Sequence, residues 1–143
     1  GGLISGVATA LKLKKPSVKV IGVEPELAAD AQASFRSGQV AEFPAEQVSR
    51  TLADGLRTQS IGALNFEHIR HYVDDIITVS EEEILEATKR LAKDPRTVAE
   101  PSGAVATAGF LFHREQLPRT KINVAVISGG NIEPEMLARV RED

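Results

Sequence analysis

The feature that most constrains the fold is an apolar segment near the end of the chain, residues 122–127, which stops at a Ser-Gly-Gly-Asn sequence at residues 128–131. The segment is rich in β-branched residues, which is typical of a strand buried on both faces of a sheet. In open parallel sheets, ligands bind beyond the carboxyl ends of the strands. We therefore expect Ser128 to stand at the mouth of a binding site. An ordinary strand-to-helix turn would give the same pattern.

The composition indicates one folded domain and excludes several kinds of site. A chain of 143 residues has the length of one domain. Its net charge of −3, from 17 basic and 20 acidic side chains, gives no large basic surface for nucleic acid or an anionic membrane. There is no cysteine, so disulfides, thiolate metal sites and a cysteine nucleophile are excluded. With no membrane-length apolar run and no secretory signal, we expect a cytoplasmic protein.

Two glycines, Gly1 and Gly2, open the chain in place of methionine, and we expect a piece of a longer polypeptide. They lead into a helix predicted over residues 3–12, which must end before Pro16. Glycine N–H groups at a helix N-terminus, together with the helix dipole, form a ready anion site. Two glycines before a helix are common, so this pattern alone is a weak signal.

A short buried strand is predicted at residues 19–23, with Glu24 at its carboxyl end and a helix after it. The carboxylates of Glu24 and Asp30, with the Ala28 carbonyl between them, could hold a hard cation such as Mg²⁺ or Ca²⁺. Acidic residues are also favoured at the start of a helix by its dipole. On spacing alone, we favour that structural explanation over a metal site.

The middle of the chain contains a predicted tight turn at Asp54-Gly55 and a strand at residues 75–79. The clearest helix start follows that strand. Ser80 can cap the helix while Glu83, three residues later, returns a hydrogen bond, which is the pattern of a capping box. We therefore predict a helix over residues 80–91.

Glu100 precedes another predicted helix, which is rich in small residues and extends to about residue 117. Its neighbours are mostly apolar, and a carboxylate buried there must be paired or have a raised pKa. With a last helix predicted at residues 134–141, strands and helices alternate along the chain. This alternation predicts an α/β fold with a parallel sheet and helices on both faces. Three strands are few, which suggests that part of the sheet lies outside this chain.

Five segments occur in the order and spacing of one enzyme family: residues 1–6, 23–25, 53–55, 98–104 and 128–131. Together they resemble the C-terminal half of the pyridoxal-phosphate-dependent serine/threonine dehydratases and serine racemases, which have the tryptophan-synthase-β-like fold, or fold type II. The resemblance covers essentially the whole chain. It implies a three-layer α/β sandwich with a mainly parallel sheet, in which residues 1–143 form the C-terminal part of the large, cofactor-binding domain.

The resemblance also implies roles for individual residues. Gly1, Gly2 and Leu3 resemble the turn that cradles the phosphate of pyridoxal 5′-phosphate, and Ser128 resembles the serine that faces the pyridine nitrogen. Gly55 and Glu100 match loop positions close to the ring and the substrate. The resemblance also implies that Glu24, the Ala28 carbonyl and Asp30 hold a divalent cation, Mg²⁺ or Ca²⁺. On this basis we favour a metal site there over the structural explanation that spacing alone favoured.

One departure from the family pattern is important. The family's Schiff-base lysine lies in a Ser-x-Lys-x-Arg-Gly type of motif, which this chain lacks. We therefore expect no catalytic residue in residues 1–143 and no activity from this chain alone. The intact protein is expected to be an ammonia-lyase that converts L-threonine or L-serine to a 2-oxo acid and ammonia by β-elimination. The resemblance also implies a homo-oligomer, a dimer or a tetramer.

Three alternatives remain open at this point. A serine racemase of the same family would share all of these segments. A non-catalytic binding module derived from the fold would explain the missing lysine. An NAD-binding domain is a third class, but no Gly-x-Gly-x-x-Gly sequence follows a predicted strand here.

Overall fold

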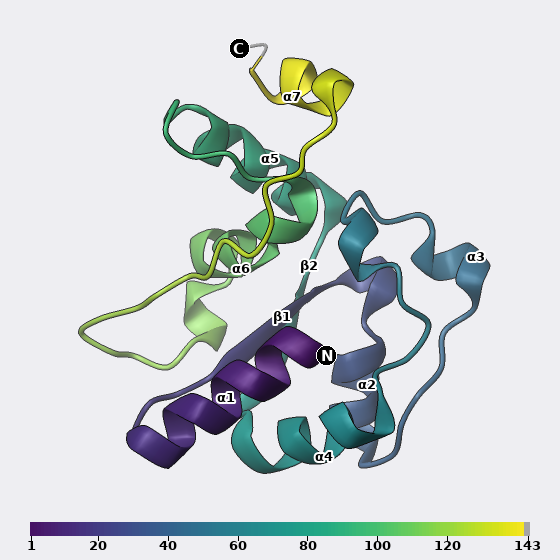
Figure 1. Cartoon of the computed structure of the whole chain (residues 1–143), viewed down its shortest axis with the longest axis vertical. Coiled ribbons are helices and arrows are strands. Elements are labelled where there is room, and N and C mark those ends of the chain that lie inside the picture. The colour runs from purple at the N-terminus through teal and green to yellow at the C-terminus, as the bar shows by residue number, and fades with distance from the viewer. Residues whose placement is uncertain (142–143) are drawn as a thin grey trace.

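The computed structural model describes residues 1–141, in which two short strands lie between helices on either side (Figure 1). The first part of the chain contains α1 (Gly2–Lys14), β1 (Ile21–Pro25), the 3-10 turn η1 (Glu26–Ala28), α2 (Asp30–Ser37), α3 (Ala45–Val48) and the 3-10 turn η2 (Asp54–Leu56). The second part contains α4 (Ala63–Tyr72), β2 (Asp75–Val79), α5 (Glu81–Ala92), α6 (Pro101–Phe112), the 3-10 turn η3 (Arg114–Gln116) and α7 (Pro134–Arg141).

The two strands pair in parallel, with Ile21 opposite Asp75 and Pro25 opposite Val79. Parallel strands need a crossover between them, and here it contains α2, α3 and α4. The predicted strands at residues 19–23 and 75–79 are thus confirmed, the first with a shift of two residues. Both carboxyl ends lie at the same edge of the sheet, as the parallel pairing requires.

One face of the sheet is covered by α1, α2 and α4. Their shared core includes Ala8, Phe66, Ile69 and the strand residue Ile76, all of which are buried. A β-carbon on Gly22 would lie 3.0 Å from Ile4 Cδ1 and 3.1 Å from Ile76 Cγ1, so a larger residue would push α1 away from the sheet.

The other face is covered by α5 and α6. Small residues of α6, among them Ala104 and Ala108, pack with Val79 of β2 and Ile84 of α5. A β-carbon on Gly109 would lie 2.9 Å from both methyl groups of Val23. The small residues predicted in this helix therefore let it lie directly on the strands, and the predicted covering of both faces is confirmed.

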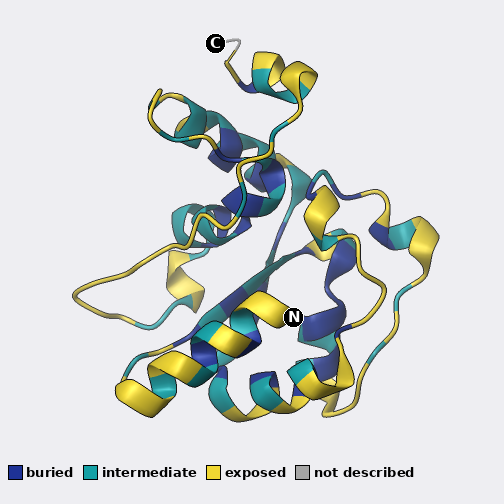
Figure 2. Cartoon of the chain, in the orientation of Figure 1, coloured by how far each residue is buried: buried dark blue, intermediate teal, exposed yellow. Residues whose placement is uncertain are grey.

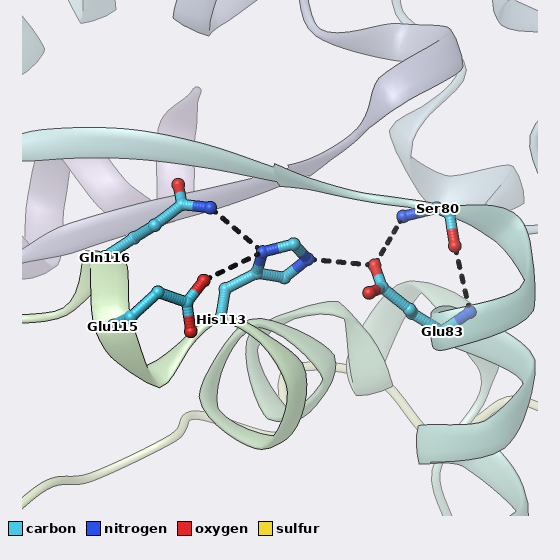
Figure 3. A network of polar contacts seen from close by, with 5 residues as sticks. All are labelled: Ser80, Glu83, His113, Glu115 and Gln116. Carbon is cyan, nitrogen blue, oxygen red and sulfur yellow. Dashed lines mark hydrogen bonds and ion pairs between the residues drawn. The ribbon is translucent and has the colours of Figure 1, made fainter.

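A polar network joins the start of α5 to the end of α6 (Figure 3). The predicted capping box is present: Glu83 N donates to Ser80 Oγ at 3.3 Å, and Ser80 N donates to the Glu83 carboxylate at 2.8 Å. His113 Nε2 donates to the same carboxylate at 3.0 Å, and Gln116 Nε2 donates to His113 Nδ1 at 3.0 Å. Burial raises the pKa of Glu83, but these bonds outweigh it and the pKa is lowered.

The third predicted strand, residues 122–127, is wrong. The segment has no strand structure and runs past α6 and α5 toward α7 (Figure 1). Instead of being buried on both faces, Ile122 and Val124 are each 82% exposed (Figure 2). A strand forms only where a neighbouring segment accepts and donates its backbone hydrogen bonds, and no segment of residues 1–141 pairs with this one.

The remaining differences concern helix ends. The helix predicted to extend to residue 117 ends at Phe112, and η3 follows it. The short helix α3, within residues 39–52, was not predicted from the sequence. Gly38 ends α2 in the left-handed region, with φ of 75°. No helix in the described part of the chain is long and apolar enough to cross a membrane.

Candidate functional site

The N-terminus of α6 is the point where three distant segments meet. Glu100 is the N-cap residue of this helix, and Pro101 occupies its first turn, where a proline costs no hydrogen bond. The turn at Asp54-Gly55 and the segment of residues 128–130 both contact this helix end. The structure thus brings Gly55, Glu100 and the segment that contains Ser128 to one helix end.

Ser102, in the first turn of α6, attaches the Asp54-Gly55 turn. Its hydroxyl donates to Asp54 Oδ1 at 3.1 Å and accepts from Gly55 N at 2.9 Å. Gly55 N also lies 2.9 Å from Asp54 Oδ1. The predicted tight turn is present as η2, and a serine that we had not singled out holds it to the helix.

Residues 128–130 pack against the start of α6 at glycines. Glu100 N donates to the Gly129 carbonyl at 3.1 Å. A β-carbon on Gly103 would overlap the Gly129 backbone, and one on Gly130 would lie 2.6 Å from the Val98 carbonyl oxygen. The absence of side chains at these glycines therefore allows backbone to lie against backbone. Residues 128–131 have no regular turn structure, so that the predicted turn is not formed, but Gly129 and Gly130 lie against the start of α6, and Ser128 is exposed next to them.

The N-terminus of α1 is a second feature of the site. Gly1 is its N-cap residue, no side chain caps the first turn, and no acidic residue lies in that turn. The first amide groups of a helix have no partner within the helix, so those of this exposed turn are available to an anion. A β-carbon on Gly1 would lie 3.0 Å from Ile69 Cδ1, so glycine is needed for the close packing on α4. Gly1, Gly2 and Leu3 thus lie at an open helix end that suits a phosphate group.

Asn65 fixes this helix end to α4. Its side-chain amide donates to Ser5 Oγ at 2.9 Å, and Ser5 Oγ in turn donates to the Gly2 carbonyl at 3.0 Å. Within residues 1–141, no hydrogen bond joins residues 1–3 to the cluster at the start of α6. The predicted cofactor-binding residues therefore form two separate groups, one at the N-terminus of α1 and one at the N-terminus of α6.

The predicted metal trio lies at the end of β1 and the start of α2. The Glu24 carboxylate accepts from Ala31 N at 3.2 Å and from Gln32 N at 2.7 Å, so it caps α2. Burial raises the pKa of Glu24 to about 7. The two backbone hydrogen bonds lower this pKa, and the nearby Asp30 carboxylate raises it further. Burial also raises the pKa of Asp30.

Asp30 is 1% exposed, and in the described structure its Oδ2 has no hydrogen-bond partner. Ala28 is buried beside it. Among residues 1–141 there is no group of three or more histidine, cysteine, aspartate or glutamate side chains that could hold a metal ion. A cation here would depend on two carboxylates and backbone oxygens.

Comparison with known protein families reduces the number of open alternatives. A family model described as "Pyridoxal-phosphate dependent enzyme" matches residues 1–129, which is most of the chain. The chain belongs to this family. The family resemblance and the α/β fold with a parallel sheet are therefore confirmed, and the match favours pyridoxal phosphate over the NAD-binding alternative.

Relatives of this chain include both lyases and racemases. The chain is 40% identical over 138 residues to the L-threo-3-hydroxyaspartate ammonia-lyase of Saccharomyces cerevisiae, and the match covers 96% of this chain and 41% of that protein. It is also 40% identical over 138 residues to the serine racemase of Schizosaccharomyces pombe, covering 96% and 42%. The crystal structure of a threonine deaminase from T.th. superposes with a TM-score of 0.85 at 44% identity, covering 93% and 47%. The chain thus spans less than half the length of these relatives.

Pyridoxal phosphate fits what the residues present offer. The exposed first turn of α1, which contains no acid, suits a phosphate dianion. The glycines around the start of α6 leave backbone groups accessible, next to the serine hydroxyl of Ser128 and the carboxylate of Glu100. Sequence reasoning had singled out residues at both of these helix ends. It missed Ser102 and Gly103, although both belong to the Glu-Pro-Ser-Gly segment that contributed to the family resemblance.

Proposed function

We propose that residues 1–143 are the C-terminal part of the cofactor-binding large domain of an L-threonine or L-serine ammonia-lyase, which forms a 2-oxo acid and ammonia. The observation that carries this proposal is that Gly55, Glu100 and the segment of residues 128–130 lie together at the N-terminus of α6. Similarity to an ammonia-lyase and to a threonine deaminase supports it.

When bound, pyridoxal phosphate withdraws electrons from the α-carbon of an amino acid, which makes the α-proton more acidic and allows a β-hydroxyl to leave. In this proposal, Gly1, Gly2 and Leu3 hold the phosphate through helix N-terminal amides rather than a cationic side chain. The Ser128 hydroxyl would be the group that faces the ring nitrogen. A neutral hydroxyl does not enforce a positive charge on that nitrogen, which suits elimination better than reactions that require a long-lived carbanion.

Glu100 and Gly55 would lie beside the ring and the substrate. The Glu100 carboxylate is close to the segment that contains Ser128, so it can orient a polar substrate group or hold a proton there. None of these residues supplies the amine that links the cofactor to the protein, and this chain alone is expected to be inactive. The lysine that performs this function would come from a segment outside residues 1–143.

The sharpest test replaces Ser128 in the complete polypeptide that carries this chain. With Ser128→Ala, the absorbance of the bound cofactor should change and ammonia release from L-threonine or L-serine should fall about tenfold, the usual scale for one lost hydrogen bond. Ser49→Ala is a matched control, because the Ser49 hydroxyl is exposed and bonds only within its own turn, to the Glu46 carbonyl. Unchanged absorbance and rate in Ser128→Ala would count against the proposal.

A serine racemase is the second candidate, supported by the 40% identity to such an enzyme. The two activities share the loss of the α-proton and differ in whether the β-hydroxyl leaves or the proton returns on the other face. Incubation with L-serine separates them. Ammonia and a 2-oxo acid in excess over D-serine identify a lyase, and an excess of D-serine identifies a racemase.

We also propose that Glu24, the Ala28 carbonyl and Asp30 hold Mg²⁺ or Ca²⁺. The support is the partly buried Glu24 and the buried Asp30, both with raised pKa values, and the unpartnered Asp30 Oδ2. Such a cation would keep the end of β1 and the start of α2 together rather than contact the substrate. It should raise the melting temperature of the wild-type chain but not of Asp30→Asn; equal stabilisation of both would refute the site.

The assembly and the compartment are further proposals. We infer a homo-oligomer, a dimer or tetramer, that works in the cytoplasm on a small amino acid. Support comes from the family membership of the chain. Sedimentation of the complete polypeptide tests the first statement, and imaging of a tagged protein tests the second.

A further inference from the structure

Ser102 forms a polar bridge between two parts of the chain that are far apart in sequence. Its hydroxyl oxygen lies 2.9 Å from Gly55 N, 47 residues away, and 3.1 Å from Asp54 Oδ1, 48 residues away. We propose that Ser102 is a positioning residue, which holds the Asp54-Gly55 turn in the geometry that the cofactor site requires. This inference rests on the proposed function, which places Gly55 and Glu100 at the cofactor.

The chemistry of the bridge requires a hydroxyl. In this arrangement, the same oxygen accepts a hydrogen bond from Gly55 N and donates one to the Asp54 carboxylate. A hydroxyl can donate and accept at one atom, whereas a methyl group can do neither and a carboxylate or ammonium can do only one. The bond to a carboxylate is charge-assisted and therefore stronger than a neutral one.

The turn closes directly onto the hydroxyl. A β-carbon on Gly55 would lie 3.1 Å from Ser102 Oγ and 3.4 Å from Ser102 Cβ, so the backbone of the turn and the serine side chain are in close contact. Gly55 has no side chain that could fix its position, so the contact with Ser102 fixes it.

The bridge does not serve as the cap of α6. The cap residue of α6 is Glu100, which makes no side-chain capping bond, and the bonds of the Ser102 hydroxyl go to the distant turn. The bridge also brings the Asp54 carboxylate to the positive end of the helix dipole, where a negative charge is favoured. The Ser102 bridge therefore holds Gly55 at a fixed distance from Glu100.

The first part of the test measures the bridge in the complete polypeptide that carries this chain, without any cofactor. Amide hydrogen exchange of Gly55 should be about fivefold faster in Ser102→Ala than in wild type, because one of two acceptors of its N–H is lost. Ser102→Thr keeps the hydroxyl and should restore slow exchange. The control is Ser49→Ala, which should leave Gly55 unchanged. Should Ser102→Ala not fold, Asp54→Ala removes the other end of the bridge at an exposed position.

The second part measures the effect on the cofactor site in the complete polypeptide loaded with pyridoxal phosphate. Ser102→Ala should raise the dissociation constant of the cofactor about fivefold and reduce the visible circular dichroism of the bound ring, and Ser102→Thr should restore both. A residue with only a structural role would change thermal stability but not these signals.

The outcomes separate this inference from the proposed function. Unchanged exchange at Gly55 in Ser102→Ala would overturn the bridge. Faster exchange with unchanged cofactor affinity and dichroism would overturn the positioning role and leave the proposed function intact. A wild-type polypeptide that binds no pyridoxal phosphate would overturn the proposed function, and with it the link from Ser102 to a cofactor.

Discussion

The amide of Glu100 donates a 3.1 Å hydrogen bond to the Gly129 carbonyl, and the Glu100 carboxylate occupies the space that a β-carbon on Gly129 would need. The residue that begins α6 and the segment that follows residues 122–127 are therefore in direct contact. Because Ser128 adjoins Gly129, the geometry of the proposed cofactor site depends on how closely this segment packs on α6, where a β-carbon on Gly103 would overlap the Gly129 backbone.

The packing of α6 on this segment predicts the effect of Gly103→Ala. The added methyl group would overlap the backbone of Gly129, so the helix or the segment must move, at a cost of about 1–3 kcal/mol in the free energy of unfolding. Urea denaturation measures this cost. Gly6→Ala is the matched control, because a β-carbon there meets nothing within 4 Å and alanine favours a helix, so this variant should be neutral or slightly more stable. Equal stability of Gly103→Ala and wild type would contradict the contact.

Glu24 predicts a pH dependence of stability. Its pKa in the folded chain is raised from 4.5 to about 7, mainly by burial. A group with a raised pKa stabilises the fold fully below its unfolded value, and this contribution is lost as the pH rises through the folded value. Discounted for the partial exposure of Glu24, the loss between pH 4.5 and 7 is about 2 kcal/mol.

Glu24→Gln mimics the protonated form and should remove this loss. Urea denaturation at several pH values between about 4.5 and 8 provides the measurement. The unfolding free energy of the variant should be nearly constant over the range in which that of the wild type declines. Parallel profiles for the two proteins would show that Glu24 does not titrate with a raised pKa.

Asp74 predicts the opposite dependence at acidic pH. Burial raises its pKa, but hydrogen bonds from Lys12 Nζ, Lys19 Nζ and Val20 N outweigh this and lower it to about 2. A lowered pKa means that the stabilisation is present above the unfolded value of 3.8 and is lost as the pH falls toward 2.

Asp74→Asn should therefore cost about 1 kcal/mol at neutral pH, a modest value because the ion pairs are partly exposed to solvent. Thermal or urea denaturation at about pH 7 and about pH 2.5 tests this, with a smaller difference between variant and wild type at the lower pH. Asp94→Asn serves as the control, since its ion pair with Arg96 is local and exposed. A cost as small as that of the control would refute a specific role for Asp74.

Local patterns predicted much of this fold. The capping box of Ser80 and Glu83 depends on residues three positions apart, and it is present. The two paired strands were recognised from short β-branched runs, and the small residues of α6 from the need to approach the sheet closely. Such features depend on nearby residues, so one sequence is sufficient to predict them.

Long-range relationships were not predicted. His113 binds the Glu83 carboxylate from 30 residues away, and nothing in its own surroundings indicates that partner. Ser102 was passed over because its bonds go to a turn 47 residues earlier. The strand expected at residues 122–127 failed for a related reason: its composition favours a strand, but a strand also requires a neighbour, which no segment of residues 1–141 provides.

The most direct test of the account is reductive trapping of the cofactor. The complete polypeptide that carries this chain is treated with pyridoxal phosphate and borohydride, digested, and searched by mass spectrometry for a pyridoxyl-lysine. The account predicts one modified lysine per polypeptide, at a position outside residues 1–143. Stoichiometric modification of a lysine within this chain, such as Lys12, Lys14 or Lys15, or the absence of any specific adduct, would contradict it.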